Sequence, residues 1–186
     1  MKKTGEDREG VLCFVTVLDA GDLGFLGGLL MLNPLGRPLE FHCTAPVKPS
    51  RAHEILYGNT LRPHLFGERL SQALLDKSAL HPDLILTDLA DVMTLQPQPG
   101  SLLVQLISGE AEFREAVGSP SVSLERFGDW QLAGESLEVV DRAKELLLGC
   151  TGIIPWEPFE RIREALREAA KTARPASTAV RTSEAA

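Results

Sequence analysis

The sequence predicts a single α/β domain built on a mixed, five-stranded sheet. Three strand patterns follow one another near the start, two further short strands are separated by helical stretches, and two amphipathic helical patterns come late. Strands joined by short turns pair antiparallel, whereas a strand reached through helices most simply pairs parallel with an earlier one. The order therefore predicts an antiparallel three-strand meander followed by parallel strands, with helices packed on the sheet.

The first three strands are predicted over residues 11–18, 25–32 and 38–45. Residues 11–18 are an unbroken, β-branched apolar run, which is typical of a strand buried on both faces. Both connections have the composition of hairpin turns. Gly27 and Gly28 inside the second strand indicate a bulge or the close approach of another segment.

The third strand alternates apolar and polar residues, which predicts a half-buried antiparallel strand. Its apolar positions share one face: Leu39, Phe41, Cys43 and Ala45. We expect Cys13 and Cys43 to be small core residues, because both lie within apolar strand patterns.

The helices begin after Pro49. Ser50 is a good N-cap for a helix over residues 51–57, and Gly58-Asn59-Thr60 should interrupt it before a second helix over about 61–77. Residues 84–88 and 101–107 read as strands, with a helical turn over 89–95 between them. The segment 108–133 fits helix or strand, and residues 135–148 and 155–172 read as helices. We expect a flexible leader over 1–9, the domain over 10–172 and a disordered tail over 173–186.

Composition restricts the function. The 186 residues carry a net charge of −7, which argues against a general nucleic-acid binder but not against a nuclease, because bound divalent cations can offset an acidic site. The three widely spaced cysteines form no C-x-x-C pair, which argues against a zinc knuckle or a redox motif, and reduced thiols fit a cytoplasmic location. The apolar stretch 23–32 is far shorter than the ~20 residues of a membrane helix, so no membrane association is expected.

Three carboxylates fall at positions suited to chemistry. Asp19 ends the first apolar run, Glu54 lies in the first turn of the first helix, and Asp88 ends the strand after the helices. With this order of elements, they resemble the ribonuclease H-like superfamily, in which an acid ends the first strand, a Glu lies early on the first helix and an Asp ends the fourth strand. The resemblance covers about residues 11–107.

The resemblance implies a divalent-metal-dependent nuclease or phosphodiesterase. Asp19, Glu54 and Asp88 would hold two cations, Mg²⁺ or Mn²⁺, one activating a water and the other stabilising the leaving oxygen. The fourth acid of the family has no clear counterpart, and three residues are open candidates: Glu110, Glu138 and Asp141.

Basic residues flank Glu54 in an otherwise acidic chain. Lys48, Arg51 and Arg62 could meet the phosphates of a nucleic acid, although a solvated helix face is the more common explanation of such residues. His53, next to Glu54, is the best candidate for an acid–base role. No phosphate-binding glycine loop and no serine-hydrolase elbow is present.

Each carboxylate also has a purely structural explanation. Asp19 could close its own turn, Glu54 could favour the helix dipole, and Asp88 could cap the following helical turn. The second predicted function is therefore a non-catalytic protein-binding or assembly domain on the same fold, which would include a homo-oligomer.

Overall fold

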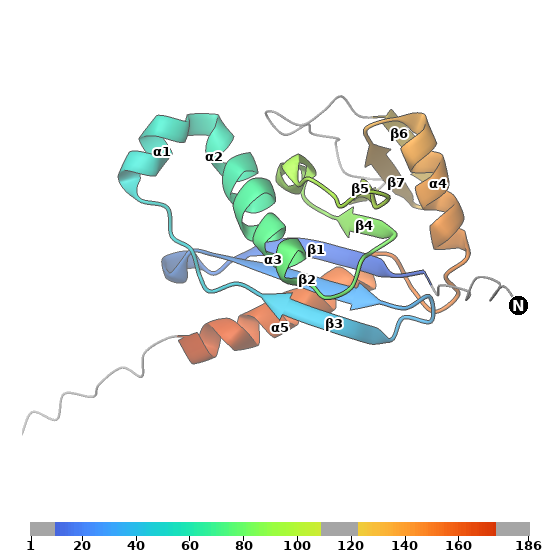
Figure 1. Ribbon diagram of the computed structural model, residues 1–186. Helices are drawn as coiled ribbons and strands as arrows, with labels where there is room; N and C mark the ends of the chain where they lie inside the picture. Colours follow the sequence, from blue (N-terminus) through green and yellow to red (C-terminus); the bar gives the residue numbers. More distant parts are fainter. Residues whose placement is uncertain (1–9, 109–122, 174–186) are drawn as a thin grey trace, which may run out of the picture.

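The computed structural model describes residues 10–108 and 123–173 (Figure 1). The predicted leader, and all but the first residue of the predicted tail, lie outside the described residues. Among the described residues, no helix is long and apolar enough to cross a membrane.

One mixed sheet organises the chain, with strand order β3-β2-β1-β4-β5-β7-β6. Antiparallel hairpins join β1, β2 and β3, and β4 and β5 continue the sheet parallel to β1. The strand bounds are Leu12–Asp19 (β1), Phe25–Leu32 (β2), Pro38–Cys43 (β3), Leu84–Thr87 (β4), Leu102–Ser108 (β5), Ser123–Phe127 (β6) and Trp130–Gly134 (β7). The predicted mixed α/β class is confirmed. Within the described residues the sheet has seven strands rather than five, because residues 123–134, most of which belong to the segment that fitted helix or strand, form the hairpin β6–β7.

Helices cover both faces of the sheet. One face is covered by the π-helical η3 (His64–Ser71), α3 (Gln72–Lys77) and η4 (Ala90–Thr94). Three short helices lead into η3: α1 (Arg51–Tyr57), η2 (Gly58–Thr60) and α2 (Leu61–Pro63). The other face carries α4 (Leu137–Leu148) and α5 (Glu157–Ala173), and a short 3₁₀ turn, η1 (Gly21–Leu23), joins β1 to β2. The predicted helix over 51–57 and its interruption at 58–60 are confirmed.

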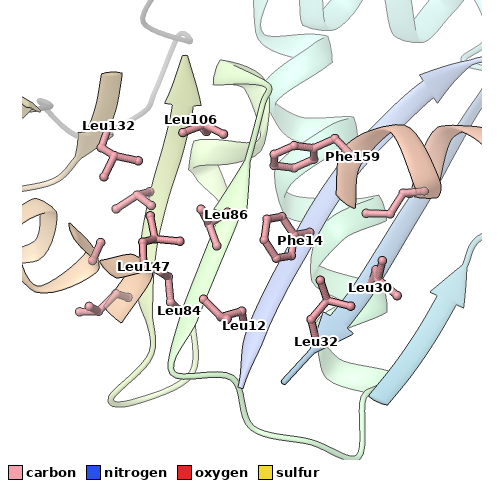
Figure 2. Close-up of a cluster of buried hydrophobic side chains, with 14 of the residues drawn as sticks. Leu12, Phe14, Leu30, Leu32, Leu84, Leu86, Leu106, Leu132, Leu147 and Phe159 are labelled. Atoms are coloured by element: carbon pink, nitrogen blue, oxygen red, sulfur yellow. The ribbon is translucent and has the colours of Figure 1, made fainter. Parts of the chain in front are cut away.

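Each face has its own hydrophobic core. Alternate residues of β1 point to opposite faces, as expected for a strand. Phe14 packs with Leu86 and with Phe159 of α5 on one side (Figure 2), while Val15 packs with the η3 side on the other. The central strands are therefore buried on both faces, which explains the unbroken apolar run of β1.

Helix α5 lies directly on the sheet at Gly28. A Cβ atom there would collide with Ile162 and would lie 3.0 Å from Cδ1 of Leu166. The close approach predicted from Gly27 and Gly28 is confirmed, and only a residue without a side chain permits it.

The predicted burial of β3 is wrong. Leu39 and Phe41 are 46% and 42% exposed, and Cys43 is exposed as well, whereas Cys13 is buried as predicted. Helix α5 contacts β1 and β2 and leaves the apolar face of β3 uncovered. The polar face, with Glu40 and His42, is instead covered by the residues that follow α3.

Candidate functional site

Asp88 is buried against α5. It directly follows β4, its side chain is 2% exposed, and it forms an ion pair with Arg163. Its second carboxylate oxygen, Oδ1, is buried without a hydrogen-bond partner among the described residues. A guanidinium, rather than a metal ion, therefore pairs with the Asp88 carboxylate.

Arg163 is held from several directions. It donates to Glu160 at 3.0 Å, and its guanidinium carbon lies 5.6 Å from the ring centre of Trp156, which stacks on Trp130. Burial and the neighbouring Arg167 lower the pKa of Arg163. An arginine remains protonated in proteins despite such shifts, so Arg163 supplies a fixed positive charge.

The register of the sheet separates Asp19 from Asp88. Val15 pairs with Thr87, so the residue beside Asp88 on β1 is Thr16, and Asp19 lies three residues further along. At 3.3 Å per residue this offset is about 10 Å along the strands. Thr16 is fully buried, and its hydroxyl oxygen has no partner among the described residues.

Asp19 closes its own turn. It is exposed at the end of β1, and its Oδ1 accepts a hydrogen bond from the backbone N–H of Gly21 at 2.9 Å. This is the Asx turn expected when an Asp ends a hairpin strand.

Glu54 lies on a helix with no buried residue. It accepts a hydrogen bond from Arg51 at 2.9 Å, and Ser50 caps the same turn by accepting from the backbone N–H of His53. In Figure 1, α1 stands away from the sheet. Asp88 directly follows β4, the middle strand of the sheet order. The structure thus places the three predicted ligands in three different surroundings.

The described residues do not fit a two-metal centre. Within 10–108 and 123–173, no three His, Cys, Asp or Glu side chains are grouped so that they could hold a metal ion. Of the candidates for a fourth acid, Glu138 and Asp141 lie on α4, and Glu110 lies outside the described residues. The predicted catalytic and metal residues stay a prediction that this arrangement does not support.

A basic groove lies between the end of the meander and the first helices. It has a volume of about 320 Å³ and combines cationic, aromatic and apolar side chains: Lys48, His53, Tyr57, His64, Arg69, Val47, Pro49, Leu61 and Leu65. None of these nine residues is acidic. The groove includes the predicted Lys48 and His53, but neither Arg51, which pairs with Glu54, nor Arg62, which pairs with Asp91.

Aromatic rings give this groove a stacking surface. Tyr57 stacks on His64 with ring centres 4.7 Å apart, and His53 meets Tyr57 edge-on at 6.2 Å. The Lys48 ammonium reaches the backbone oxygen of Asp22 at 3.3 Å, and His64 contacts Glu68 at 2.7 Å. Sequence reasoning noted the basic stretch but missed Tyr57, because only the turn at 58–60 brings it against His64.

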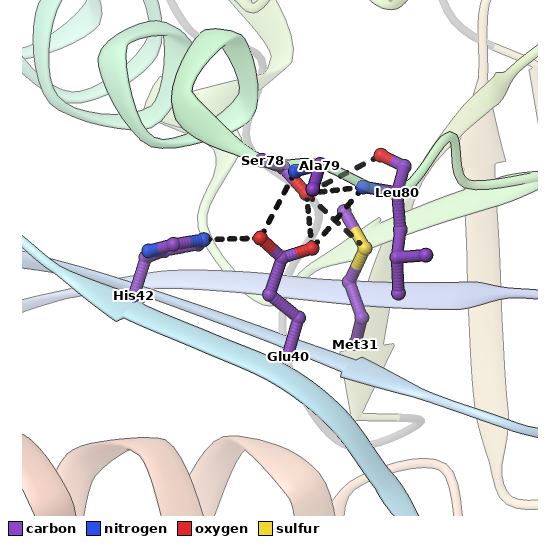
Figure 3. Close-up of polar contacts among 6 residues, drawn as sticks. All are labelled: Met31, Glu40, His42, Ser78, Ala79 and Leu80. Carbon is purple, nitrogen blue, oxygen red and sulfur yellow. Dashed lines mark hydrogen bonds and ion pairs between the residues drawn. The ribbon is translucent and has the colours of Figure 1, made fainter.

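A second carboxylate, half-buried, was not predicted from the sequence. Glu40 accepts hydrogen bonds from the Ser78 hydroxyl at 2.7 Å and from the backbone N–H groups of Ala79 and Leu80, and it pairs with His42 at 2.5 Å (Figure 3). Burial alone would raise the pKa of Glu40, but these hydrogen bonds lower it to about 2. The available signal was an acid and a histidine two residues apart on one face of a strand.

Similar solved structures identify the fold. An Endonuclease V variant from Ciona intestinalis, in complex with DNA containing an inosine followed by a ribo-adenosine, has a TM-score of 0.51 and 11% identity; the match covers 90% of this chain and 88% of that chain. The catalytic domain of human Endonuclease V has a TM-score of 0.50 and 14% identity, covering 89% and 85%. The chain therefore has a ribonuclease H-like fold, as predicted. Neither a protein-family model nor a curated protein sequence matches it significantly.

Proposed function

We propose that this chain binds single-stranded nucleic acid through the basic groove. The observation that carries the proposal is the composition of the groove, in which Lys48 and Arg69 line the same hollow as the stacked Tyr57 and His64. Cations that meet a phosphate backbone and rings that stack on bases are the two components of sequence-tolerant single-strand binding.

The charge of the groove contrasts with the rest of the protein. The chain carries −7 overall, which repels a nucleic acid at long range, whereas lysine, arginine and histidine gather at the groove. The groove is also roomy enough, at about 320 Å³, to receive a base. The similar Endonuclease V structure holds DNA, which makes a nucleic-acid partner a natural hypothesis for this chain.

A divalent-metal-dependent nuclease is the second candidate function. It is favoured by the ribonuclease H-like fold and by Asp88 at the end of β4, whose Oδ1 has no hydrogen-bond partner within residues 10–108 and 123–173. Asp88 would have to exchange Arg163 for a metal ion, and Asp19 and Glu54 would have to leave their present partners. The residues as arranged therefore favour binding over cleavage.

Fluorescence anisotropy with a labelled single-stranded oligonucleotide tests the proposal. Lys48→Glu should weaken binding at least about tenfold. It should also reduce the slope of log affinity against log salt concentration by about one, the value expected for one lost phosphate contact. Tyr57→Ala should cost about 1–3 kcal/mol of binding free energy through lost stacking. Lys77→Glu, which makes the same charge change at the end of α3, is the matched control and should bind more tightly than Lys48→Glu.

Equal weakening by Lys48→Glu and Lys77→Glu would contradict the proposal, because binding would then follow net charge alone. An inosine-containing DNA incubated with Mn²⁺ addresses the second candidate. Cleavage that disappears in Asp88→Asn, but not in Lys77→Glu, would favour the nuclease.

A further inference from the structure

β3 forms one edge of the sheet. Within the described residues it pairs with β2 on its inner side, and no strand pairs with it on its outer side. Edge strands of this kind present unpaired backbone N–H and C=O groups that can bind another strand.

The direction of these backbone groups follows from the register. The N–H of Thr44 donates to the oxygen of Gly27 at 3.0 Å, so residue 44 has its backbone groups turned toward β2. Hydrogen-bonded and non-hydrogen-bonded pairs alternate along an antiparallel ladder. The backbone groups of Phe41 and Cys43 are therefore directed outward, to the open edge.

The side chains beside this edge are apolar and exposed. Leu39 and Phe41 are 46% and 42% exposed, and Leu35 in the preceding turn is 59% exposed. Natural edges are usually protected by lysine, proline or a bulge. Here Pro38 and the bulge between Met31 and Leu32 fall at the start of the strand, and residues 39–43 contain no lysine.

We propose that β3 pairs antiparallel with β3 of a second copy of this chain, about a two-fold axis at Phe41. The two Phe41 residues would then exchange both of their outward hydrogen bonds. Leu39 would lie opposite Cys43 of the second copy, which continues the apolar face. Glu40 would lie opposite His42 of the second copy, so no like charges oppose each other on the other face.

This match is what favours a second copy as the occupant. At this register the strand is compatible with itself in hydrogen bonds, in apolar contacts and in charge. The interface is isologous and closes at two subunits. A six-residue strand pair is a small interface, so the dimer should form reversibly and depend on concentration. The inference does not rest on nucleic-acid binding, because β3 contributes no residue to the basic groove.

Sedimentation velocity over a range of concentrations tests the dimer. The wild type should shift from monomer to dimer, and Phe41→Lys should weaken the dimer at least tenfold by placing a charge at the two-fold axis. Phe41→Pro removes only an outward N–H, which an edge strand tolerates, and should weaken it similarly. Leu56→Lys is the control, because Leu56 is an equally apolar side chain, 80% exposed on α1, and should leave the dimer unchanged.

Disulfide trapping locates the axis. In a Cys43→Ser background, Phe41→Cys should give a covalent dimer when diamide removes two electrons and two protons from the facing thiols. The expected Cα separation of about 5.5 Å in a hydrogen-bonded pair suits a disulfide. Leu56→Cys in the same background should stay monomeric on a non-reducing gel. A wild type that remains monomeric at every concentration, or a dimer that Phe41→Lys leaves intact, would overturn the inference.

Discussion

The half-buried carboxylate of Glu40 and the buried carboxylate of Asp88 lie on opposite faces of the sheet and are stabilised in different ways. Glu40 is surrounded by four donors, three of them on consecutive residues after α3 (Figure 3). Asp88 has one cation, Arg163, and one oxygen without a hydrogen-bond partner in the described part of the chain. The first is a completed structural contact that joins β3 to the segment after α3. The second depends on a single partner.

This difference indicates which of the two carboxylates could still bind a metal ion. A carboxylate whose oxygens accept a full set of hydrogen bonds has no oxygen left to coordinate a metal ion. A carboxylate with one oxygen that accepts no hydrogen bond can still coordinate a metal ion through that oxygen. Glu40 is therefore excluded as a metal ligand on its contacts alone. Asp88 is excluded as a metal ligand only while Arg163 remains paired with it.

Removal of Arg163 should have the largest effect. Arg163→Ala leaves Asp88 buried and uncompensated, and should lower the free energy of unfolding by about 3–5 kcal/mol. Urea denaturation followed by far-UV circular dichroism measures the change. The double variant Asp88→Asn/Arg163→Met should recover much of the loss, because no buried charge remains. A loss under about 1 kcal/mol for Arg163→Ala would show that the pair is not buried in solution.

Glu40 should give a smaller and pH-dependent effect. Glu40→Gln should cost about 2 kcal/mol at neutral pH, since hydrogen bonds to a charged group are lost. Because folding lowers the pKa of Glu40 to about 2, its contribution is present above the ordinary value of 4.5 and is lost as the pH falls toward 2. The gap between wild type and variant, from denaturation at several pH values, should narrow over that window. A gap that is constant with pH would show that the carboxylate charge is not what stabilises this contact.

Thr16 should give the smallest effect, with the opposite sign. Its buried hydroxyl has no partner among the described residues, so Thr16→Val should raise the free energy of unfolding by about 1 kcal/mol. Thermal melts measure the change, and Thr87→Val is the control. The Thr87 hydroxyl accepts a hydrogen bond from the backbone N–H of Leu89, so its loss should destabilise the protein. Destabilisation by Thr16→Val would indicate a bound water or ion beside Asp88.

Local patterns predicted the elements well, and long-range contacts explain the rest. Residues 51–60 were predictable because the cap Ser50 and the stop Gly58 act within one turn. The burial of β3 was not predictable from the sequence, because the alternation of its residues defines two faces but does not show which face a helix covers. The ion-pair partner of Asp88 was not predictable either, since Arg163 lies 75 positions later in the chain. Arg163 reaches Asp88 because α5 packs on the sheet at Gly28.

The candidate site shows the same limit. Topology placed Asp19, Glu54 and Asp88 at the ends of the expected elements, but the distance between them depends on the register of β1 with β4 and on how far α1 stands from the sheet. Neither quantity is encoded in residue spacing. The basic stretch was visible in the sequence, whereas its meeting with Tyr57 in one groove required the fold.

Oligonucleotide binding measured in EDTA and again in Mn²⁺ tests the central claim most directly. If the basic groove binds the strand and Arg163 neutralises Asp88, a labelled single strand should bind in EDTA, should bind no more tightly in Mn²⁺, and should remain intact in both buffers. Binding or cleavage that appears only with Mn²⁺, and is lost in Asp88→Asn, would contradict this account.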